Sequence, residues 1–235
     1  MKFGSLFSGI GGIDLGLERA GMTCIWQSEI EPYACQVLKK HWPDIPNLGD
    51  IRDINWTEIP TPDVVAGGYP CQPFSLVGPR KGEHDPRHLW PEFSQCLRIL
   101  RPRYALLENV PGHLSLGFGT VLADLAALGY DTQWDCIPAA AVGAHHRRNR
   151  VFVIATNTNK QRLERRDSTK VQKWPDTNRF AGQKNWWATE PDVCRVAHGI
   201  PRRVDRLRAL GNAVVPQVAE HIGNIIMEAD NDCSV

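Results

Sequence analysis

The stretch Lys2-Phe-Gly-Ser-Leu-Phe-Ser-Gly-Ile-Gly-Gly12 decides the fold class of this chain of 235 residues. The segment 2–7 is a short, mainly apolar run, which is typical of a buried strand. The glycines that follow it predict a tight turn. A second apolar run, Cys24–Glu29, and a helical pattern over Pro32–His41 come next. The chain therefore starts with a strand, a glycine turn and a helical connection to a second strand.

The same alternation continues over the next hundred residues or so. The predicted strands are Asp63–Gly68, Tyr104–Val110, Thr132–Ile137 and Arg150–Thr156, and the predicted helices are Leu89–Leu100 and Gly119–Leu128. Strands that alternate with helices predict an α/β fold with a mostly parallel, doubly wound sheet. Ligands of such sheets bind at the carboxyl ends of the strands, so the residues directly after each strand are candidates for a site.

The pattern changes after Thr156. Residues 157–192 are polar and basic, have few aliphatic residues and contain three tryptophans, and helical patterning returns from Val193. We therefore expect a core over 1–156, a short basic lobe over 157–192 and a helical part over 193–235.

The composition is that of an ordinary soluble protein, with 42% apolar and 23% charged residues. No apolar run approaches the length of a membrane span, and the N-terminus lacks the apolar centre of a secretory signal, so we expect a cytoplasmic protein. The seven cysteines are odd in number and contain no C-x-x-C pair. This count favours neither a disulfide framework nor a zinc site.

The net charge of +1 hides an asymmetry. Residues 145–210 carry 16 Lys and Arg against 6 Asp and Glu, whereas residues 1–144 carry 11 against 16. A basic part beside an acidic part indicates a polyanionic partner that touches one side of the molecule. A solvated basic face is the alternative interpretation.

The glycine turn is the first candidate site. A G-x-G-x-x-G fingerprint fails because Asp14 holds its third glycine position. Glu29 nevertheless lies 20 residues beyond Gly9, at the end of a strand, where a carboxylate can accept hydrogen bonds from ribose hydroxyls. We expect Asp50 to follow a third strand and to add a second acid. These features indicate a nucleoside cofactor, and the alternative is a tight turn with two surface carboxylates.

A cysteine after the next strand is the second candidate. Most cysteines are small buried apolar residues, but two glycines and two prolines fix the backbone around Cys71 in Gly67-Gly-Tyr-Pro-Cys-Gln-Pro-Phe-Ser75. This setting predicts a nucleophile, which must act as the thiolate. The polar loop over residues 76–88 is predicted to close over a bound substrate.

Two further candidates are polar groups beside buried strands. Glu108 ends an apolar strand, where a carboxyl group is costly without a partner, so it is a candidate acid or base or else a cap or a salt-bridged residue. The run His145-His-Arg-Arg-Asn-Arg150 predicts contacts with phosphate or with a base. A histidine metal site is disfavoured there because the neighbouring positive charges repel a cation.

In this order, the motifs resemble those of the DNA cytosine-5 methyltransferase family over about residues 3–156 and 193–227. FSGIGG is similar to the family's F-x-G-x-G-G motif, GGYPCQPFS to its nucleophile motif and Glu108-Asn-Val to its E-N-V motif. The run from His146 to Arg150 stands where the family has Q-x-R-x-R, and Gly211-Asn-Ala-Val-Val-Pro216 is similar to the last motif, G-N-S-V.

The resemblance implies a Rossmann-like fold that depends on S-adenosylmethionine, and a C-terminal part that returns to the core. It implies methyl transfer to C5 of a flipped-out cytosine in double-stranded DNA, through a covalent bond between Cys71 and C6. The implied catalytic residues are Cys71, Glu108, Arg148 and Arg150. The implied cofactor residues are Phe7, Gly9, Gly11, Gly12, Glu29, Ile30, Asp50, Ile51, Pro70 and Asn212. The implied DNA contacts are Gln72, Ser75, Arg80, Lys81, Arg87, His146 and Arg147.

The resemblance also carries expectations about partners and some departures. We expect a monomer without a metal, encoded by a bacterium or a phage. If its role is restriction-modification, a cognate restriction enzyme is its expected partner. His145 and His146 replace a Pro-Gln pair, and Ala213 replaces a serine. The 157–192 segment is much shorter than the family's target-recognition domain, which predicts short or relaxed sequence recognition, or else a remnant without productive DNA docking.

Three other functions stay open at this point. An RNA cytosine methyltransferase is one, although the C-F-T signature of the tRNA-methylating branch is absent from the sequence. A DNA- or cofactor-binding protein that has lost catalysis is the second. A nicotinamide enzyme is the third, and Asp14 in the glycine fingerprint disfavours it. The recognition sequence and the choice between self-protection, restriction-modification and regulation are not readable from the chain.

Overall fold

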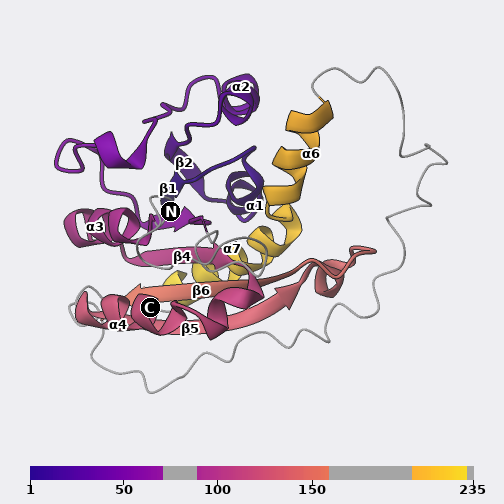
Figure 1. Cartoon of the computed structure of the whole chain (residues 1–235). Helices are drawn as coiled ribbons and strands as arrows, with labels where there is room; N and C mark the ends of the chain where they lie inside the picture. The colour runs from indigo at the N-terminus through magenta and orange to yellow at the C-terminus, as the bar shows by residue number, and fades with distance from the viewer. Residues whose placement is uncertain (71–88, 159–202, 232–235) are drawn as a thin grey trace.

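The computed structural model describes residues 1–70, 89–158 and 203–231, and one six-stranded sheet runs through this part of the chain (Figure 1). Its strand order is β2-β1-β3-β4-β6-β5. The strands are β1 (Lys2–Leu6), β2 (Thr23–Ser28), β3 (Val64–Gly67), β4 (Tyr104–Asn109), β5 (Tyr130–Pro138) and β6 (Asn149–Asn157). β2, β1, β3 and β4 are parallel, and β6 runs antiparallel to both β4 and β5. The predicted α/β fold with a mostly parallel sheet is confirmed.

Six α-helices are described. They are α1 (Gly12–Arg19), α2 (Pro32–His41), α3 (Trp90–Leu100), α4 (Phe118–Ala127), α6 (Arg203–Asn212) and α7 (Pro216–Asn231), with short 3-10 helices η1 (Ile51–Asp53), η4 (Pro111–Ser115) and η5 (Ala139–Val142). Apart from a strand expected before Asp50, the predicted strands and helices of residues 1–156 agree with these bounds to within two residues. In the described residues, no helix is long and apolar enough to cross a membrane.

Two hydrophobic cores lie on opposite faces of the sheet. On β4, Tyr104 and Leu106 belong to the core that α1 and α7 cover, whereas Ala105 and Leu107 belong to the core that α3 and α4 cover. Alternate residues of a strand point to opposite faces, so this division makes a three-layer arrangement. Burial on both faces explains why β3 and most of β4 and β6 are nearly continuous apolar runs, whereas the edge strand β5 is polar and partly exposed.

The C-terminal part returns to the N-terminal helix, as the resemblance implies. α7 packs along α1, and a Cβ on Gly16 would lie only 2.4 Å from the Pro216 carbonyl oxygen. The two backbones approach closely because this position has no side chain. Of the three expected parts of the chain, 157–192 lies outside the described residues apart from its first two positions.

One predicted element is absent from the described residues. The strand expected before Asp50 does not form, and only an isolated bridge joins Asn47 to Gln27. Pro43 and Pro46 interrupt this segment, and proline has no amide hydrogen for a strand ladder. Near the C-terminus, α6 continues through Asn212 and α7 begins at Pro216, so residues 213–215 separate the two helices.

Candidate active site

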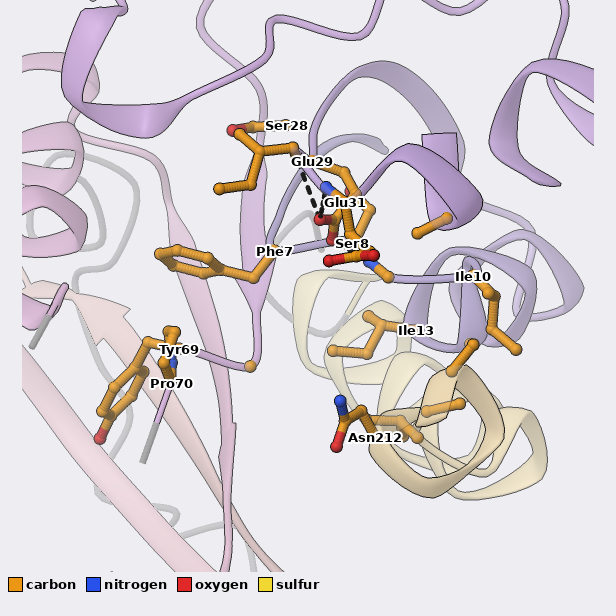
Figure 2. A pocket seen from close by; sticks show the side chains of 18 of the residues that line it. Phe7, Ser8, Ile10, Ile13, Ser28, Glu29, Glu31, Tyr69, Pro70 and Asn212 are labelled. Carbon is orange, nitrogen blue, oxygen red and sulfur yellow. Dashed lines mark hydrogen bonds between the residues drawn. The ribbon is translucent and has the colours of Figure 1, made fainter. Parts of the chain in front are cut away.

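A cavity of about 370 Å³ opens at the carboxyl ends of β1, β2, β3 and β4 (Figure 2). Figure 2 shows Phe7, Ser8 and Ile13 on one side of an open space, with Tyr69 and Pro70 on another side and Asn212 below. The volume lies within the range of about 300–1,000 Å³ for small-molecule sites. The cavity therefore stands where ligands of parallel α/β sheets bind.

Glu29 holds the glycine turn at the end of β2. Its Oε2 accepts a hydrogen bond from the Gly9 amide at 2.7 Å, and its Oε1 accepts from the Ile30 and Glu31 amides at 2.8 Å each. A carboxylate has about four acceptor positions, so three amides leave one for a ligand hydroxyl. The remaining acceptor position fits a ribose hydroxyl of a nucleoside cofactor.

Asp50 lies on the same wall and begins η1. Its Oδ1 accepts from the Arg52 amide at 3.0 Å and from Arg52 Nε at 2.9 Å. The Arg52 guanidinium holds the pKa of the Asp50 carboxyl below its usual value. Asp50 is therefore a fixed anion that can accept a hydrogen bond from an exocyclic amino group, and the buried Ile51 beside it offers an apolar surface.

Nine of the ten predicted cofactor residues line this cavity: Phe7, Gly9, Gly12, Glu29, Ile30, Asp50, Ile51, Pro70 and Asn212. Gly11 instead lines a neighbouring cavity of about 1070 Å³. Gly11 has φ 81°, and a Cβ there would lie 2.4 Å from the Trp42 ring. The structure therefore gives Gly11 a packing role at the start of α1.

Glu108 and Arg150 form an ion pair on the opposite wall. Arg150 Nε lies 2.9 Å from Glu108 Oε1, and both residues line the cavity. A Cβ on Gly68 would lie 2.5 Å from Glu108 Oε2, so the carboxyl occupies space that a side chain at position 68 would fill. Arg150 is thus the partner that a buried Glu108 needs. Glu108 is salt-bridged and also lines the cavity, so a salt-bridged Glu108 and a candidate acid or base are not exclusive alternatives.

Glu108 is poised to carry or release a proton near neutral pH. Burial, the largest effect, raises the pKa of its carboxyl to about 7, and the charges of Arg150 and Arg148 oppose that rise. A carboxyl with this pKa is present in both forms at pH 7, which suits a general acid or base.

Arg148 lines the neighbouring cavity of about 1070 Å³ instead of this one. Its Nη2 donates to the Gly211 carbonyl oxygen at 2.7 Å and to the Ala213 carbonyl oxygen at 2.5 Å. These bonds tie the segment before β6 to the end of α6, which carries Asn212, and to the turn that follows it. His146 and Arg147 are exposed on the same segment.

The segment that leads to Cys71 is held at its start. The Tyr69 hydroxyl lies 2.7 Å from His113 Nε2, and Asn109 Nδ2 donates to the Tyr69 carbonyl oxygen at 3.2 Å. The residue before Pro70 is thereby bound to the segment that follows Glu108. Cys71 and the predicted DNA contacts Gln72, Ser75, Arg80, Lys81 and Arg87 lie outside the described residues.

Sequence reasoning missed several residues of the site. Asp205 and Arg208 of α6 line the cavity, and Arg208 lies 3.7 Å from the Glu31 carboxylate across its mouth. The contact of His113 with Tyr69 was also missed. The only signal for it in the sequence was that a histidine follows the E-N-V motif. Among the described residues, no group of three or more His, Cys, Asp or Glu side chains is placed to hold a metal ion.

Comparisons with known proteins agree with this geometry. A family model of C-5 cytosine-specific DNA methylases matches residues 1–193. The type II methyltransferase M.BsuFI of Bacillus subtilis is 37% identical over 159 residues, which are 66% of this chain and 39% of that protein. The type II methyltransferase M.NgoMIV of Neisseria gonorrhoeae is 37% identical over 185 residues, which are 76% of this chain and 57% of that protein. The chain thus spans less than two thirds of the length of these relatives.

Solved structures share the fold. An E. coli prophage protein assigned as a DNA modification methyltransferase has a TM-score of 0.59 and 27% identity, covering 68% of this chain and 48% of that one. The Dnmt2 methyltransferase of S. pombe has a TM-score of 0.58 and 20% identity, covering 73% of this chain and 57% of that one.

Proposed function

The chain belongs to the C-5 cytosine-specific DNA methylase family, and on this premise we propose that it transfers a methyl group from S-adenosylmethionine to C5 of cytosine in double-stranded DNA. One observation carries the proposal. The ion pair between the buried Glu108 and the partly buried Arg150 lines the cavity from β4 and β6, and Glu29 and Asp50 line the same cavity. Acid–base chemistry and cofactor binding thus share one cavity.

The cavity residues fit the parts of this cofactor. Glu29 would accept hydrogen bonds from the ribose hydroxyls, Asp50 would accept one from the adenine amino group, and Phe7 would offer its ring to the adenine face. The Phe7–Gly12 turn and Asn212 would hold the methionine end. The cofactor supplies an electrophilic methyl group bonded to a positively charged sulfur.

Cytosine C5 is a weak nucleophile, and the chain's own groups activate it. The Cys71 thiolate forms a bond to C6, and the ring electrons shift toward C5 as Glu108 donates its proton to N3. C5 would then be the nucleophile toward the electrophilic methyl group that the cofactor would supply, and the bonding electron pair would stay on the cofactor's sulfur. Loss of the C5 proton to solvent expels Cys71 as a thiolate, and Glu108 takes back the N3 proton. Covalent addition divides one difficult step into easier ones.

The target base must leave the duplex for this chemistry. C6 and C5 are inaccessible inside the stack, and flipping a base out costs about a few kcal/mol. Arg150 binds the O2 edge of the flipped base, and the basic residues of 145–210 contact the phosphates. We propose that the short 157–192 segment reads few bases, so that sequence recognition is short or relaxed.

The setting of the enzyme follows from the same premise. We propose a cytoplasmic monomer that acts on double-stranded DNA. The relatives bear names of type II methyltransferases, and a restriction enzyme of matching specificity is the partner to look for.

Transfer of a labelled methyl group from S-adenosylmethionine to DNA and to tRNA tests the proposal. We expect label in DNA cytosine, no label in tRNA, and no transfer by Cys71→Ser, although that variant still binds the cofactor. Label in tRNA alone would favour the RNA enzyme. Cofactor binding without transfer to either substrate would favour a binding protein, and unchanged transfer by Cys71→Ser would remove the nucleophile assignment.

A further inference from the structure

The proposed reaction leaves one buried acid without a role. Asp14 is fully buried in the first turn of α1. Its Oδ2 accepts a hydrogen bond from Ser5 Oγ at 2.9 Å, and its Oδ1 accepts from Gln27 Nε2 at 2.7 Å. Ser5 lies on β1 and Gln27 on β2, so three elements beneath the cofactor cavity meet at this carboxyl group.

Ser5 connects Asp14 to the cavity wall. Ser8 Oγ lies 2.9 Å from Ser5 Oγ and 3.2 Å from the Ser5 carbonyl oxygen. Ser8 lines the cavity within the glycine turn, where Figure 2 shows it beside Glu29. The Ser8 carbonyl oxygen also accepts from the Gly11 amide at 2.9 Å. One hydroxyl group therefore separates a buried carboxyl from the wall that faces the ligand.

The direction of this hydrogen-bond chain depends on the charge of Asp14, because each hydroxyl has one proton to donate. When Asp14 is ionised, Ser5 donates to it and Ser8 donates to Ser5, which leaves a lone pair of Ser8 Oγ free for a ligand. When Asp14 is protonated, the proton lies on Oδ2, since Gln27 donates to Oδ1. Ser5 then donates to Ser8, Ser8 turns to the Ser5 carbonyl, and an acceptor position of Ser8 is consumed.

We propose that Asp14 is a positioning residue that acts through Ser5 and Ser8 and favours a cationic nucleoside cofactor over its uncharged-sulfur product. This inference rests on the proposed function. S-adenosylmethionine carries a sulfonium charge, which S-adenosylhomocysteine lacks after methyl transfer. A buried anion beneath the turn attracts that charge, and the free acceptor on Ser8 suits a donor on the ligand.

The charged and titratable neighbours of Asp14 are few. The charge of Glu18, on α1, raises the pKa of Asp14, and Cys24, on β2, is close enough for the charge of Asp14 to raise the pKa of its thiol. On α7, Glu220 lies 3.9 Å from Arg19 at the surface. Burial, the largest effect, raises the pKa of Asp14 to about 6, and hydrogen bonds from Gln27, Ser5 and the Asp14 backbone oppose that rise.

The sign of the pH effect follows by linkage. A cation in the cavity favours ionised Asp14 and so lowers the pKa of its carboxyl. By reciprocity, affinity for the cationic cofactor rises as the pH increases through about 6, and affinity for the uncharged product changes less.

Equilibrium binding of both compounds to the full chain, measured by calorimetry between about pH 5 and about pH 8, tests the inference. Glu108→Gln serves as the parent, because the Glu108 carboxyl lines the same cavity and titrates nearby. We expect the parent to bind S-adenosylmethionine about fivefold more tightly at the upper pH. Asp14→Asn should abolish that difference and weaken binding about fivefold at the upper pH, with less than about a twofold change for S-adenosylhomocysteine.

Two further variants complete the test. Ser5→Ala keeps the Asp14 carboxyl but removes the hydroxyl that links it to Ser8. It should therefore reduce the pH dependence of cofactor binding. This variant decides the question if Asp14→Asn does not fold. Asp131→Asn removes an exposed carboxylate and should behave as the parent. If the parent binds both compounds and the folded variants match its affinities at every pH, the inference about Asp14 is overturned and the proposed function is unaffected. If the parent binds neither compound, the proposed function fails and the inference fails with it.

Discussion

Arg150 Nε lies 2.9 Å from Glu108 Oε1 where β4 ends and β6 begins beside the cavity. The two residues come from neighbouring antiparallel strands, in which Asn109 lies opposite Val151. The register of this strand pair brings the Glu108 carboxyl and the Arg150 guanidinium together. The guanidinium gives the buried carboxyl a partner, yet burial still prevails and leaves the Glu108 pKa at about 7. A reactive proton is thereby kept at a fixed place in the cavity wall.

Glu108 should make the stability of the protein depend on pH. Its carboxyl has an ordinary pKa of 4.5 and a folded-state pKa of about 7, so the folded state binds the proton more tightly. The resulting stabilisation is present below about pH 4.5 and is lost as the pH rises through about 7. In Glu108→Gln, the loss of unfolding free energy between about pH 5 and about pH 8 should be smaller by about 1–3 kcal/mol.

Urea unfolding at the two pH values measures this difference. Glu58→Gln is the matched control, since Glu58 is exposed. Equal pH dependence of the wild type and Glu108→Gln would show that Glu108 is already ionised in the folded protein at acid pH.

Gly68→Ala should impair methyl transfer by moving Glu108. The new Cβ would lie 2.5 Å from Glu108 Oε2, so the carboxyl must leave its place beside Arg150. We expect kcat to fall by about tenfold or more. Gly119→Ala in α4 meets no atom within 4 Å and should leave kcat unchanged while stabilising the helix by about 1 kcal/mol. Similar kcat values for both variants would contradict the positioning of Glu108 by this glycine.

Arg148→Ala should weaken cofactor binding more than it slows chemistry. Arg148 holds the carbonyls of Gly211 and Ala213 on either side of Asn212, so its loss loosens the turn that closes the cavity. We expect the Kd for the cofactor to rise about tenfold, measured by calorimetry. Arg147→Ala, an exposed neighbour, should keep the wild-type Kd, and a parallel change in both variants would indicate a general effect of charge.

Tyr69→Phe should destabilise the fold. It removes the hydroxyl that lies 2.7 Å from His113 Nε2 in a buried setting. Loss of one partner of a buried hydrogen bond costs about 1–3 kcal/mol. Urea unfolding measures the change, and an unchanged midpoint would mean that this bond contributes little to holding the residue before Pro70.

The sequence was informative wherever local pattern and topology act together. Pro32 begins α2 as predicted, because proline suits the first turn of a helix. Glu29 and Glu108 are far apart in the chain, yet both lie at the carboxyl ends of parallel strands of one sheet, β2 and β4, so the strand pattern alone predicts that they share one edge of the sheet. The cofactor wall was therefore largely predictable.

Other contacts depend on distant pairs that no local pattern marks. Tyr69 and His113 are 44 positions apart, and Arg148 reaches a carbonyl 65 positions away. The strand expected before Asp50 was wrong because two prolines break its ladder. Asp14 entered the sequence reasoning only as a mismatch in a glycine fingerprint, whereas the structure shows it at the centre of a buried hydrogen-bond network.

Base-resolution mapping of 5-methylcytosine tests the central claim most directly. DNA is taken from methylation-deficient bacteria that express the chain, with Cys71→Ser as the control. We predict new marks at cytosines in a short common sequence, present with the wild type and absent with Cys71→Ser. No marks from a folded protein that binds S-adenosylmethionine, or equal marks with both chains, would contradict the account.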